Sequence, residues 1–516
     1  MTESNHHAVS RTAVPKVILA IVGLFCIAVA LGWPQRGTQL IVGELTHAEA
    51  IASTPMVASA AAPALWMVLP FAAILVSIAI LPLVPATQHW WDSNQSKLIV
   101  AVGLSLLTLA YYALMHHAPL EGHWPSHHLI EPIGTGARTA FVRTILENAI
   151  LQEYIPFIVL LFSLYTISGG IRIHGDLTAD PLTNASFLAI GAVLANLIGT
   201  TGAAMLLIRP LLETNQQRQH VAHTVVMFIF IVCNCGGLLL PLGPPMFLGY
   251  LAGVPFFWTL RLCTAWLLIV GLLIVIYVLL DHFAFYHRET IADIERDIER
   301  TRKIEFSGWQ LNAPLLLGIV LAVALLDPSK AFPDTTWHPW LYLREIVELM
   351  MVAISMHWGS QKVRDQNQFN FAAILEVAVL FIGIFICMQP ALDILGVYGN
   401  QIGINTPARF FWASGSLSSV LDNAPTYLVF FTAAQSMHAA DGAKLVAGVD
   451  PTVLAGISLG SVCMGAMTYI GNGPNFMVKA IAERSGVRMP SFFGYMAYSF
   501  TILLPVFALA AWKFLM

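Results

Sequence analysis

Apolar runs about as long as a lipid bilayer is thick recur along the whole chain. A helix needs ~20 apolar residues to cross the hydrocarbon core of a membrane. The 516-residue chain is 57% hydrophobic and only 10% charged, whereas a soluble domain carries about 25% charged residues. The runs lie near residues 17–34, 64–86, 98–115, 152–171, 185–212, 222–252, 259–281, 314–327, 341–358, 371–395, 408–434, 452–482 and 491–515. The sequence therefore predicts an all-α polytopic membrane protein with about 11–13 membrane elements, some of them hairpins or broken helices.

The distribution of basic residues predicts an orientation. Arg11 and Lys16 precede the first apolar run, and the loop after it carries only Arg36. Because cytoplasmic loops are rich in Lys and Arg, we expect a cytoplasmic N-terminus, and the predicted location is the cell inner (plasma) membrane. The run at 17–34 is followed by no small-residue cleavage signature, so it is predicted to be a retained helix.

A charged stretch divides the apolar region into two halves. Residues 282–312 mix basic and acidic side chains at helical spacing, which is typical of a solvated, cytoplasmic helical linker. We expect four parts: an N-terminal tail, first helix and outer loop at 1–63, a first half at 64–281, the linker at 282–312, and a second half at 313–516.

Three groups of polar or reactive side chains have an ordinary interpretation. The segment 116–150 is predicted to be a wet interfacial loop; a metal site is the alternative, but no acidic or Cys partner stands at a fixed ligand spacing. Its histidines are His116, His117, His123, His127 and His128. Residues Arg344, Glu345 and Glu348 are predicted to be interfacial and mutually paired. The six cysteines lie in apolar segments and are predicted to be buried free thiols.

The most informative polar stretch at membrane depth covers residues 416–431, SLSSVLDNAPTYLVFF. Asp422, Asn423 and Thr426 stand beside Pro425 in an otherwise apolar run. An ionised carboxylate at this depth is costly unless it faces a cavity or a cation, and Pro425 disfavours helix before it. Because non-helical backbone survives at that depth only where it lines a protein-enclosed cavity, we interpret the stretch as half of an ion or substrate site.

Segments of the first half have counterparts, in the same order, in the second half. Glu153–Gly170 and Glu376–Asp393 both open on Glu, and the nearby Arg172 and Lys362 indicate opposite directions across the membrane. The other pairs are 196–210 with 418–432, 234–247 with 465–476, and 252–258 with 485–493. Opposite direction of equivalent segments is what an inverted repeat requires, so we expect one repeat at 153–258 and the other at 376–493.

The matched patches suit ion coordination. Gly lets the backbone approach a ligand closely, and Pro interrupts the helical ladder and frees carbonyl groups. Freed carbonyls with Asn and Thr oxygens suit a hard cation such as Na⁺, while half-helix N-termini attract anions. The alternative, that such motifs only kink or pack helices, stays open. The candidate ligands are Asp422, Asn423, Thr426, Asn472, Asn475, Thr200, Thr201, Asn196 and Asn234.

At these residues the sequence resembles the ion-transporter superfamily, which contains citrate and dicarboxylate carriers, arsenite exporters and D-type sodium/proton antiporters. Residues 468–475 (TYIGNGPN) look like its T-P-x-G-x-P-P-N broken-helix motif, and 240–246 (LPLGPPM) look like a degraded first copy without the terminal Asn. Residues 421–426 (LDNAPT) resemble the L-D-N-x-P/T hairpin tip of antiporter-like members. Residues 198–202 (IGTTG) stand where dicarboxylate carriers have a Ser-Asn-Thr tip, but here Ser and Asn are replaced.

The resemblance covers residues 60–515 and is nearest to an antiporter-like or citrate-transporter branch. It implies two inverted-topology repeats, each with a re-entrant hairpin and a broken helix. It also implies a scaffold portion that often forms a homodimer and a transport portion that moves across the membrane.

The predicted function is secondary active transport, with sodium/proton antiport first. Asp422 would exchange a proton for Na⁺, and the ion would be held at Asp422, Asn423 and Asn472. The alternative is Na⁺- or H⁺-coupled uptake of citrate or a dicarboxylate, in which Arg209 contacts the anion. Arsenite export is a third reading, since neutral arsenite needs no charged ligand.

Other function classes fit the residues less well. An enzyme needs a nucleophile–base or metal constellation at membrane depth, and the histidines lie mostly outside the matched motifs. We therefore expect no enzyme activity and no cofactor besides Na⁺ and H⁺ as coupling ions. A channel would lack the two-fold repeat of broken helices. The expected partners are the lipid bilayer, a small ion or organic anion and a second copy, but no nucleic acid. Glu153 and Glu376 are possible proton-linked carboxylates or interfacial groups.

Overall fold

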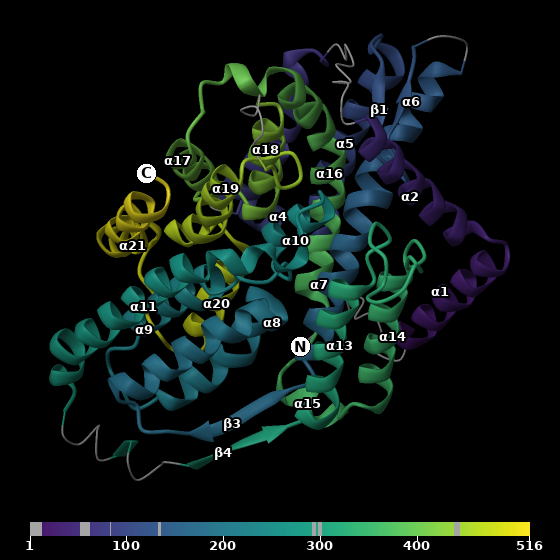
Figure 1. Ribbon diagram of the computed structural model, residues 1–516. Helices are drawn as coiled ribbons and strands as arrows, with labels where there is room; N and C mark the ends of the chain where they lie inside the picture. Colours follow the sequence, from purple (N-terminus) through teal and green to yellow (C-terminus); the bar gives the residue numbers. More distant parts are fainter. Residues whose placement is uncertain are drawn as a thin grey trace. The chain divides into compact units, whose positions relative to one another are not determined.

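The computed structural model describes residues 13–51, 62–82, 84–132, 136–290, 296–297, 302–437 and 444–516, leaving out the side chains of 44–51 and 302–303. Helices dominate these residues (Figure 1). The strands form two small antiparallel pairs, β1(Leu120–Gly122) with β2(His128–Ile130) and β3(Arg172–Asp176) with β4(Arg302–Ser307). The predicted all-α polytopic class is confirmed. Arg11, used to predict the orientation, lies outside the described residues.

Seven helical stretches within the described residues are long and apolar enough to cross a membrane, and a pair of helices bent by 102° makes an eighth candidate. The seven are Ala13–Ala30, Asn94–Leu114, Ala137–Ser168, Pro181–Thr214, Phe256–Arg288, Ala372–Gln401 and Phe492–Phe514, and the bent pair is Leu65–Ile80 with Pro85–Trp91. Fewer long spans than apolar runs are found because several runs are interrupted into shorter helices, such as Ala222–Cys235 and Pro451–Met467.

The chain divides into two compact units. Unit 1 comprises Met1–Ile167, Pro314–Ser360 and Gln368–Tyr398, and unit 2 comprises Ser168–Ala313, Gln361–Asn367 and Gly399–Met516. Each unit takes segments from both sides of the charged linker, so the compact units and the predicted halves divide the chain differently. The inverted relation of the halves stays a prediction.

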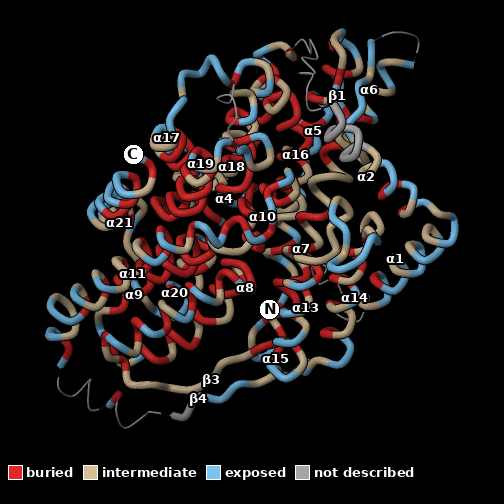
Figure 2. Tube along the Cα trace, viewed as in Figure 1, coloured by how far each residue is buried: buried red, intermediate tan, exposed pale blue. Residues whose placement is uncertain are grey.

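Unit 1 is built around one long helix. Its helices are α1(Ala13–Ala30), α2(Trp33–Ile51), η1(Leu65–Val68), α3(Leu69–Ile80), α4(Pro85–Trp91), α5(Asn94–Leu114), α6(Ala137–Leu146), the π-helical η2(Glu147–Tyr154), α7(Ile155–Ser168), most of α13(Trp309–Leu325), α14(Leu343–Trp358) and α16(Ala372–Tyr398). Helix α16 packs against α5, α3 and η2. Helix α1 packs on α14 but buries only Val14 and Ile18 (Figure 2), which is typical of a helix that faces lipid.

Unit 2 contains the interrupted helices. Its helices are α8(Pro181–Thr214), α9(Ala222–Phe230), the π-helical η3(Ile231–Cys235), α10(Pro244–Leu251), η4(Phe256–Leu262), α11(Cys263–Leu280), the π-helical η5(Asp281–Phe285), η6(Tyr286–Arg288), α15(Gln361–Gln366), η7(Gly399–Gln401), α17(Pro407–Ser418), α18(Asn423–Gln435), α19(Pro451–Cys463), η8(Met464–Met467), α20(Gly473–Arg484) and α21(Phe492–Phe514). Helix α19 packs against α17 and α18, and α20 packs against α8 and α9. Nearly all residues of α9 and η3 are buried (Figure 2), so they form the core of this unit.

Local sequence signals explain where two of these helices begin. Asp180 and Asp450 each precede a proline at the first helical position. The Asp180 carboxylate accepts hydrogen bonds from the backbone N–H groups of Leu182 and Thr183, at 2.9 and 2.8 Å. An acidic N-cap followed by Pro satisfies N–H groups that lack helical partners.

Two local predictions are wrong in part. The outer loop expected after the first helix begins with α2, because its residues include good helix formers such as Ala and Glu. The linker expected to be helical starts with η5 and η6 but contains strand β4, in which Ile304 and Phe306 alternate with charged Lys303 and Glu305. Alternation with a period of two favours a strand.

Other side chains follow their predictions in part. Among the free cysteines, Cys26 is exposed and Cys263 half-buried, and the buried thiols are Cys233, Cys235, Cys387 and Cys463. The predicted ion pair between Arg344 and Glu345 is present at 2.5 Å. Glu348, by contrast, is fully buried, and neither carboxylate oxygen has a hydrogen-bond partner within the described chain.

Candidate functional site

Each of the four patches singled out by the sequence interrupts a helix of unit 2. Helix α8 kinks at Gly199 (φ 72°, ψ 159°), a left-handed conformation that favours glycine. Residues 236–243 separate η3 from α10, residues 419–422 separate α17 from α18, and residues 468–472 separate η8 from α20. The predicted broken backbone is therefore present at all four places.

Three buried asparagines in or next to two of these breaks form one hydrogen-bonded group, here called the amide cluster: Asn234 in η3, Asn472 in the break before α20, and Asn475 in α20. Asn234 Nδ2 donates to Asn475 Oδ1 at 2.8 Å, and Asn472 Nδ2 donates to Asn234 Oδ1 at 3.1 Å. Their exposed fractions are 0%, 4% and 0%. The cluster joins residues 241 positions apart in the sequence, so it brings η3 against the break before α20.

The amide cluster also holds the surrounding backbone. Asn475 Nδ2 donates to the carbonyl oxygens of Gly465 and Thr468, at 2.9 and 3.0 Å. Asn472 Nδ2 donates to the Cys233 carbonyl at 2.9 Å. Asn234 stands in a π-helical turn, a local distortion that is frequent at functional sites.

Carbonyl oxygens from two breaks converge on Gly471, and we call this arrangement the Gly471 cradle. A Cβ added at Gly471 would lie 2.6 Å from Gly465 O, 2.8 Å from Ser418 O and 3.1 Å from Ser419 O. Thr468 Oγ1 donates to Ser419 O at 2.5 Å, which ties the α17–α18 break to the break before α20. Only glycine fits here, because any side chain would collide with backbone oxygens.

The first half of the chain supplies a smaller polar set to the same unit. Asn196 Oδ1 accepts a hydrogen bond from Leu239 N at 2.7 Å and so holds the break before α10. The methyl group of Thr200 lies against Gly237 in that break, and Thr201 is half-buried next to it on α8. These predicted ligands face a break, but Asn196 has a structural hydrogen bond already.

Asp422 and its neighbours lie at the start of α18. Asp422 Oδ1 accepts a hydrogen bond from Ala424 N at 3.1 Å, and Thr426 Oγ1 donates to the Asp422 carbonyl at 2.9 Å. Asn423 is buried, and its Oδ1 has no hydrogen-bond partner in the described part of the chain. Among the described residues, no hydrogen bond joins Asp422 or Asn423 to Asn472. The shared Na⁺ site at these three residues therefore stays a prediction.

Comparison with known proteins identifies the family of the chain. A family model described as "Putative citrate transport" matches residues 60–515. The chain belongs to this citrate transport family. No curated protein matches the chain. Family membership and the apolar helices show a multi-pass membrane protein of a transporter family.

The carboxylates predicted to be proton-linked in this citrate transport family member lie in unit 1. Glu153 Oε2 accepts a hydrogen bond from Gln389 Nε2 at 3.2 Å. Glu376 forms an ion pair with Lys97 at 2.7 Å. Glu153 lies in the π-helical η2, which packs against α16, so the two segments predicted to be equivalent are in contact.

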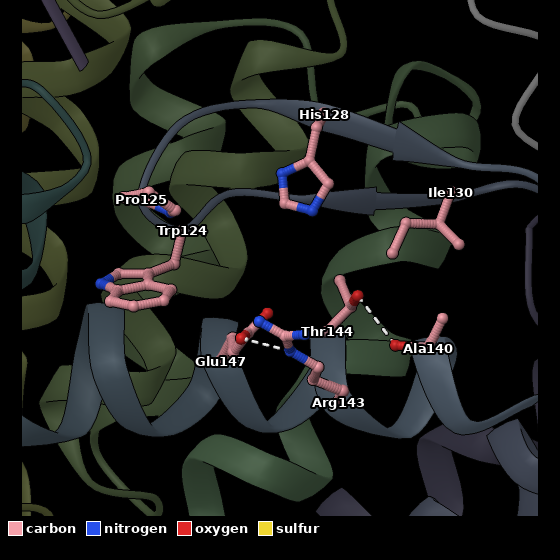
Figure 3. Close-up of a pocket in the computed structure, with 8 residues that line it drawn as sticks. All are labelled: Trp124, Pro125, His128, Ile130, Ala140, Arg143, Thr144 and Glu147. Carbon is pink, nitrogen blue, oxygen red and sulfur yellow. Dashed lines mark hydrogen bonds and ion pairs between the residues drawn. The ribbon is translucent and has the colours of Figure 1, made fainter. Parts of the chain in front are cut away.

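Unit 1 also contains a pocket of about 250 Å³ (Figure 3). Trp124, Pro125, His128 and Ile130 from the β1–β2 hairpin line it together with residues of α6 and η2. None of the predicted site residues lines this pocket, so it is not the predicted transport site.

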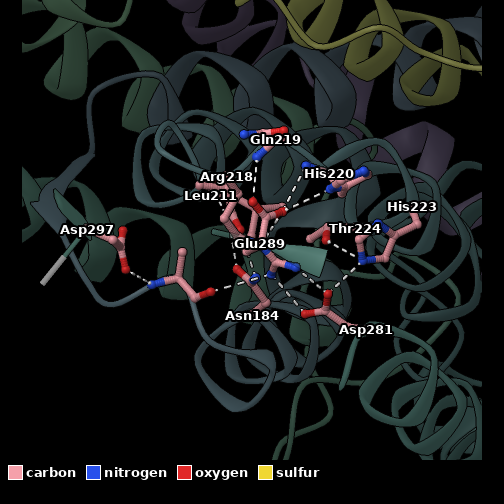
Figure 4. Close-up of polar contacts among 12 residues, drawn as sticks. Asn184, Leu211, Arg218, Gln219, His220, His223, Thr224, Asp281, Glu289 and Asp297 are labelled. Carbon is pink, nitrogen blue, oxygen red and sulfur yellow. Dashed lines mark hydrogen bonds and ion pairs between the residues drawn. The ribbon is translucent and has the colours of Figure 1, made fainter. Parts of the chain in front are cut away.

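A second buried polar group in unit 2 was not predicted from the sequence. We call Arg218, His223, Asp281 and Glu289 the charged cluster (Figure 4). Arg218 donates to both oxygens of Asp281, at 2.5 and 2.9 Å, and His223 Nε2 lies 2.9 Å from Asp281 Oδ1. The available signal was the position of Arg218 between two apolar runs and of Asp281 at the end of the run 259–281.

Proposed function

We propose that this member of the citrate transport family is a secondary transporter that carries citrate, or a related small carboxylate, by alternating access with Na⁺ or H⁺ as the coupling ion. The observation that carries the proposal is the Gly471 cradle. It places backbone carbonyl oxygens from two broken helices around one glycine, beside the amide cluster.

The cradle oxygens pack against Gly471 itself, so a small cation would bind at their remaining lone pairs and not at the glycine position. Gly465 O and Ser419 O each accept one hydrogen bond from the protein, and a carbonyl oxygen has two lone pairs. Neutral oxygens freed by helix breaks coordinate Na⁺ in transporters built from discontinuous helices. Asp422 would add a negative charge from the same α17–α18 break as Ser419.

The end of one half-helix supports binding of an anion. Helix α20 begins at a break, and its N-terminus has no side-chain hydrogen-bond cap. Helix α10 also begins at a break, but Pro244 and Pro245 at its first two positions carry no N–H group. Free N–H groups at a helix N-terminus attract carboxylates. Helix α18 differs, because the Asp422 carboxylate already caps it. Arg209, half-buried on α8, would add one positive charge to the anion site.

Sodium/proton antiport is a second candidate, and the α18 N-terminus favours it. The Asp422 carboxylate accepts one hydrogen bond, from the backbone N–H of Ala424. The adjacent Asn423 Oδ1 is buried without a partner in the described chain. A carboxylate beside an unsatisfied amide oxygen can exchange a proton for a cation. This candidate needs no site for an organic anion.

Reconstituted protein separates the two candidates. Proteoliposomes containing a pH-sensitive dye are challenged with Na⁺, Li⁺, or citrate, and uptake of labelled citrate is measured in parallel. We expect citrate uptake that requires a Na⁺ or H⁺ gradient. A dye response to the cation alone, without citrate flux, would overturn the citrate proposal in favour of antiport.

The proposal includes an inner (plasma) membrane location, a cytoplasmic N-terminus and a homodimer. The family resemblance supports the dimer, and the positions of the basic residues support the orientation. Protease accessibility of the N-terminal tail in sealed vesicles tests the orientation, and mass measurement in detergent tests the dimer.

A further inference from the structure

The hairpin of β1 and β2 brings together three side chains that can bind a metal ion. His127 Nδ1 lies 2.9 Å from Glu121 Oε1 and 3.1 Å from His123 Nδ1. One ligand atom from each of the three residues lies within 4.8 Å of the others. The sequence offered no acidic partner at a fixed spacing for these histidines, but strand pairing supplies one in Glu121.

Two of the three distances between these atoms are close to those in a tetrahedral metal site, and the third pair lies within 4.8 Å. Zinc binds His nitrogen and carboxylate oxygen at about 2.0–2.2 Å, so neighbouring ligand atoms in a tetrahedral site lie about 3.3 Å apart. Imidazole and carboxylate ligands suit Zn²⁺, Co²⁺, Ni²⁺ and Cu²⁺. Two histidines and one glutamate leave the fourth position of a tetrahedral site for water.

A residue outside the cluster holds two of the three ligands in place. Asn148 Oδ1 accepts a hydrogen bond from the backbone N–H of His123 at 2.8 Å, and Asn148 Nδ2 donates to the Glu121 carbonyl at 3.1 Å. Asn148 is buried at the start of η2. The ligand-bearing backbone is therefore braced from a helix, as in metal sites whose outer partners orient the ligands.

A fourth histidine of the hairpin, His128, makes different contacts from His123 and His127. His128 lines the pocket shown in Figure 3, and its Nδ1 lies 2.9 Å from the Ser126 carbonyl. His128 pairs with Gly122 across the hairpin. It lies on the same hairpin but outside the cluster, so it provides a matched control.

We propose that Glu121, His123 and His127 bind one divalent transition-metal ion of the zinc class, with water as the fourth ligand. The bound ion clamps the β1–β2 loop, and Asn148 connects the clamp to η2. This site is separate from the residues proposed to bind the transported solute, and it does not depend on that proposal.

Metal binding to the full-length chain in detergent tests the proposal, with His6 and His7 replaced by Ala in every sample to remove the N-terminal histidine pair. Co²⁺ serves as the probe, because a four-coordinate Co²⁺ site gives visible d–d absorption. We expect one Co²⁺ per chain, displaced by Zn²⁺. His123→Ala and His127→Ala should abolish the spectrum, whereas His128→Ala should leave it unchanged.

Two further variants keep the result interpretable. Asn148→Ala removes the brace but no ligand, and we expect it to weaken metal binding by about 10–100-fold. Glu121→Gln keeps the shape of the side chain, and we expect it to abolish tight binding. Size-exclusion profiles establish that each variant is folded. Absence of a Co²⁺ spectrum in the parent protein, or equal loss in His128→Ala, would overturn the proposal.

Discussion

The amide cluster and the charged cluster are both buried in unit 2, but they satisfy their polar atoms in different ways. In the charged cluster, Asp281 receives hydrogen bonds from Arg218 and Tyr277 and lies 2.9 Å from His223 Nε2. The carboxylate of Glu289 accepts hydrogen bonds from the backbone N–H groups of Gln219 and His220, at 3.0 Å each. The negative charge of each carboxylate is therefore balanced by hydrogen-bond donors of the protein itself.

The amide cluster contains no formal charge and leaves oxygen lone pairs available. Asn234, Asn472 and Asn475 donate to one another and to backbone carbonyls, while the Gly471 cradle adds further oxygens. Removing one partner of a buried ion pair destabilises a fold, because the other charge stays buried. Converging neutral oxygens are suited to a cation. We therefore expect the charged cluster to affect stability and the amide cluster to affect transport.

The largest expected effect is on transport, from Gly471→Ala. The new methyl group would occupy the space between Gly465 O and Ser418 O and so block the cradle. We expect cation-coupled citrate uptake to fall to the level of protein-free vesicles. Gly271→Ala on α11 is the matched control, because a Cβ there meets nothing within 4 Å and the residue lies outside the proposed site. Equal loss in both variants would contradict a specific role for the cradle.

Arg218→Met should have the next largest effect, a loss of folding stability. Removing one partner of a buried ion pair costs about 3–5 kcal/mol, because the other charge stays buried. We expect a lower unfolding midpoint, measured with a dye that reacts with the buried cysteines as they become exposed, and unchanged uptake per folded molecule. Arg218→Met combined with Asp281→Leu should recover part of the stability. Loss of uptake in the folded variant would break the division of roles between the clusters.

Asn475→Leu should change both properties. The substitution removes the acceptor for Asn234 Nδ2 and the donors to Gly465 O and Thr468 O. A buried polar group left unsatisfied costs about 1–3 kcal/mol, so we expect a smaller stability loss than for Arg218→Met but little remaining uptake. Unfolding curves and uptake measured on the same preparation provide the check; a stable variant with normal uptake would contradict the site.

Asp422→Asn should change cation dependence with little effect on folding. The variant keeps an oxygen at the α18 N-terminus but loses the negative charge, so we expect the KM for the coupling cation to rise at least about tenfold, equivalent to 1.4 kcal/mol of binding. Uptake is measured over a range of cation concentrations. An unchanged KM would place the cation at the carbonyl oxygens alone.

Arg209→Gln should have the smallest effect. A half-exposed ionic contact contributes about 0.2–1 kcal/mol, so we expect the KM for citrate to rise about twofold to fivefold while the cation dependence stays the same. Arg261, which is exposed on η4, provides the control as Arg261→Gln. A shift of equal size in both variants would indicate a general charge effect.

Several predictions that rest on neighbouring residues succeeded. Helix breaks at Gly199, before Pro244 and around Asp422 follow from the backbone properties of Gly, Pro and capping residues, which act within a few positions. Strand β4 could also have been found from its period-two pattern. The helical interpretation failed there because charge spacing was weighed above alternation of apolar residues.

Predictions that needed distant partners were incomplete. Asn234, Asn472 and Asn475 were all candidate ligands, but their mutual hydrogen bonds join segments more than 200 residues apart. The charged cluster was missed, and the metal-site alternative for His123 and His127 was ranked second, for a related reason. No spacing rule connects Arg218 to Asp281, and a turn geometry unknown from the sequence decides whether Glu121 meets His127.

The sequence by itself determined a multi-pass helical membrane protein whose helices break at four polar patches. Hydrophobic length and the Gly and Pro effects are local properties, so they can be read along the chain. Only the tertiary structure decided which oxygens converge on Gly471 and which charges neutralise one another. Which oxygens converge depends on how separate segments pack. In unit 2, packing places the amide cluster in a candidate site and pairs the charges of the charged cluster with one another.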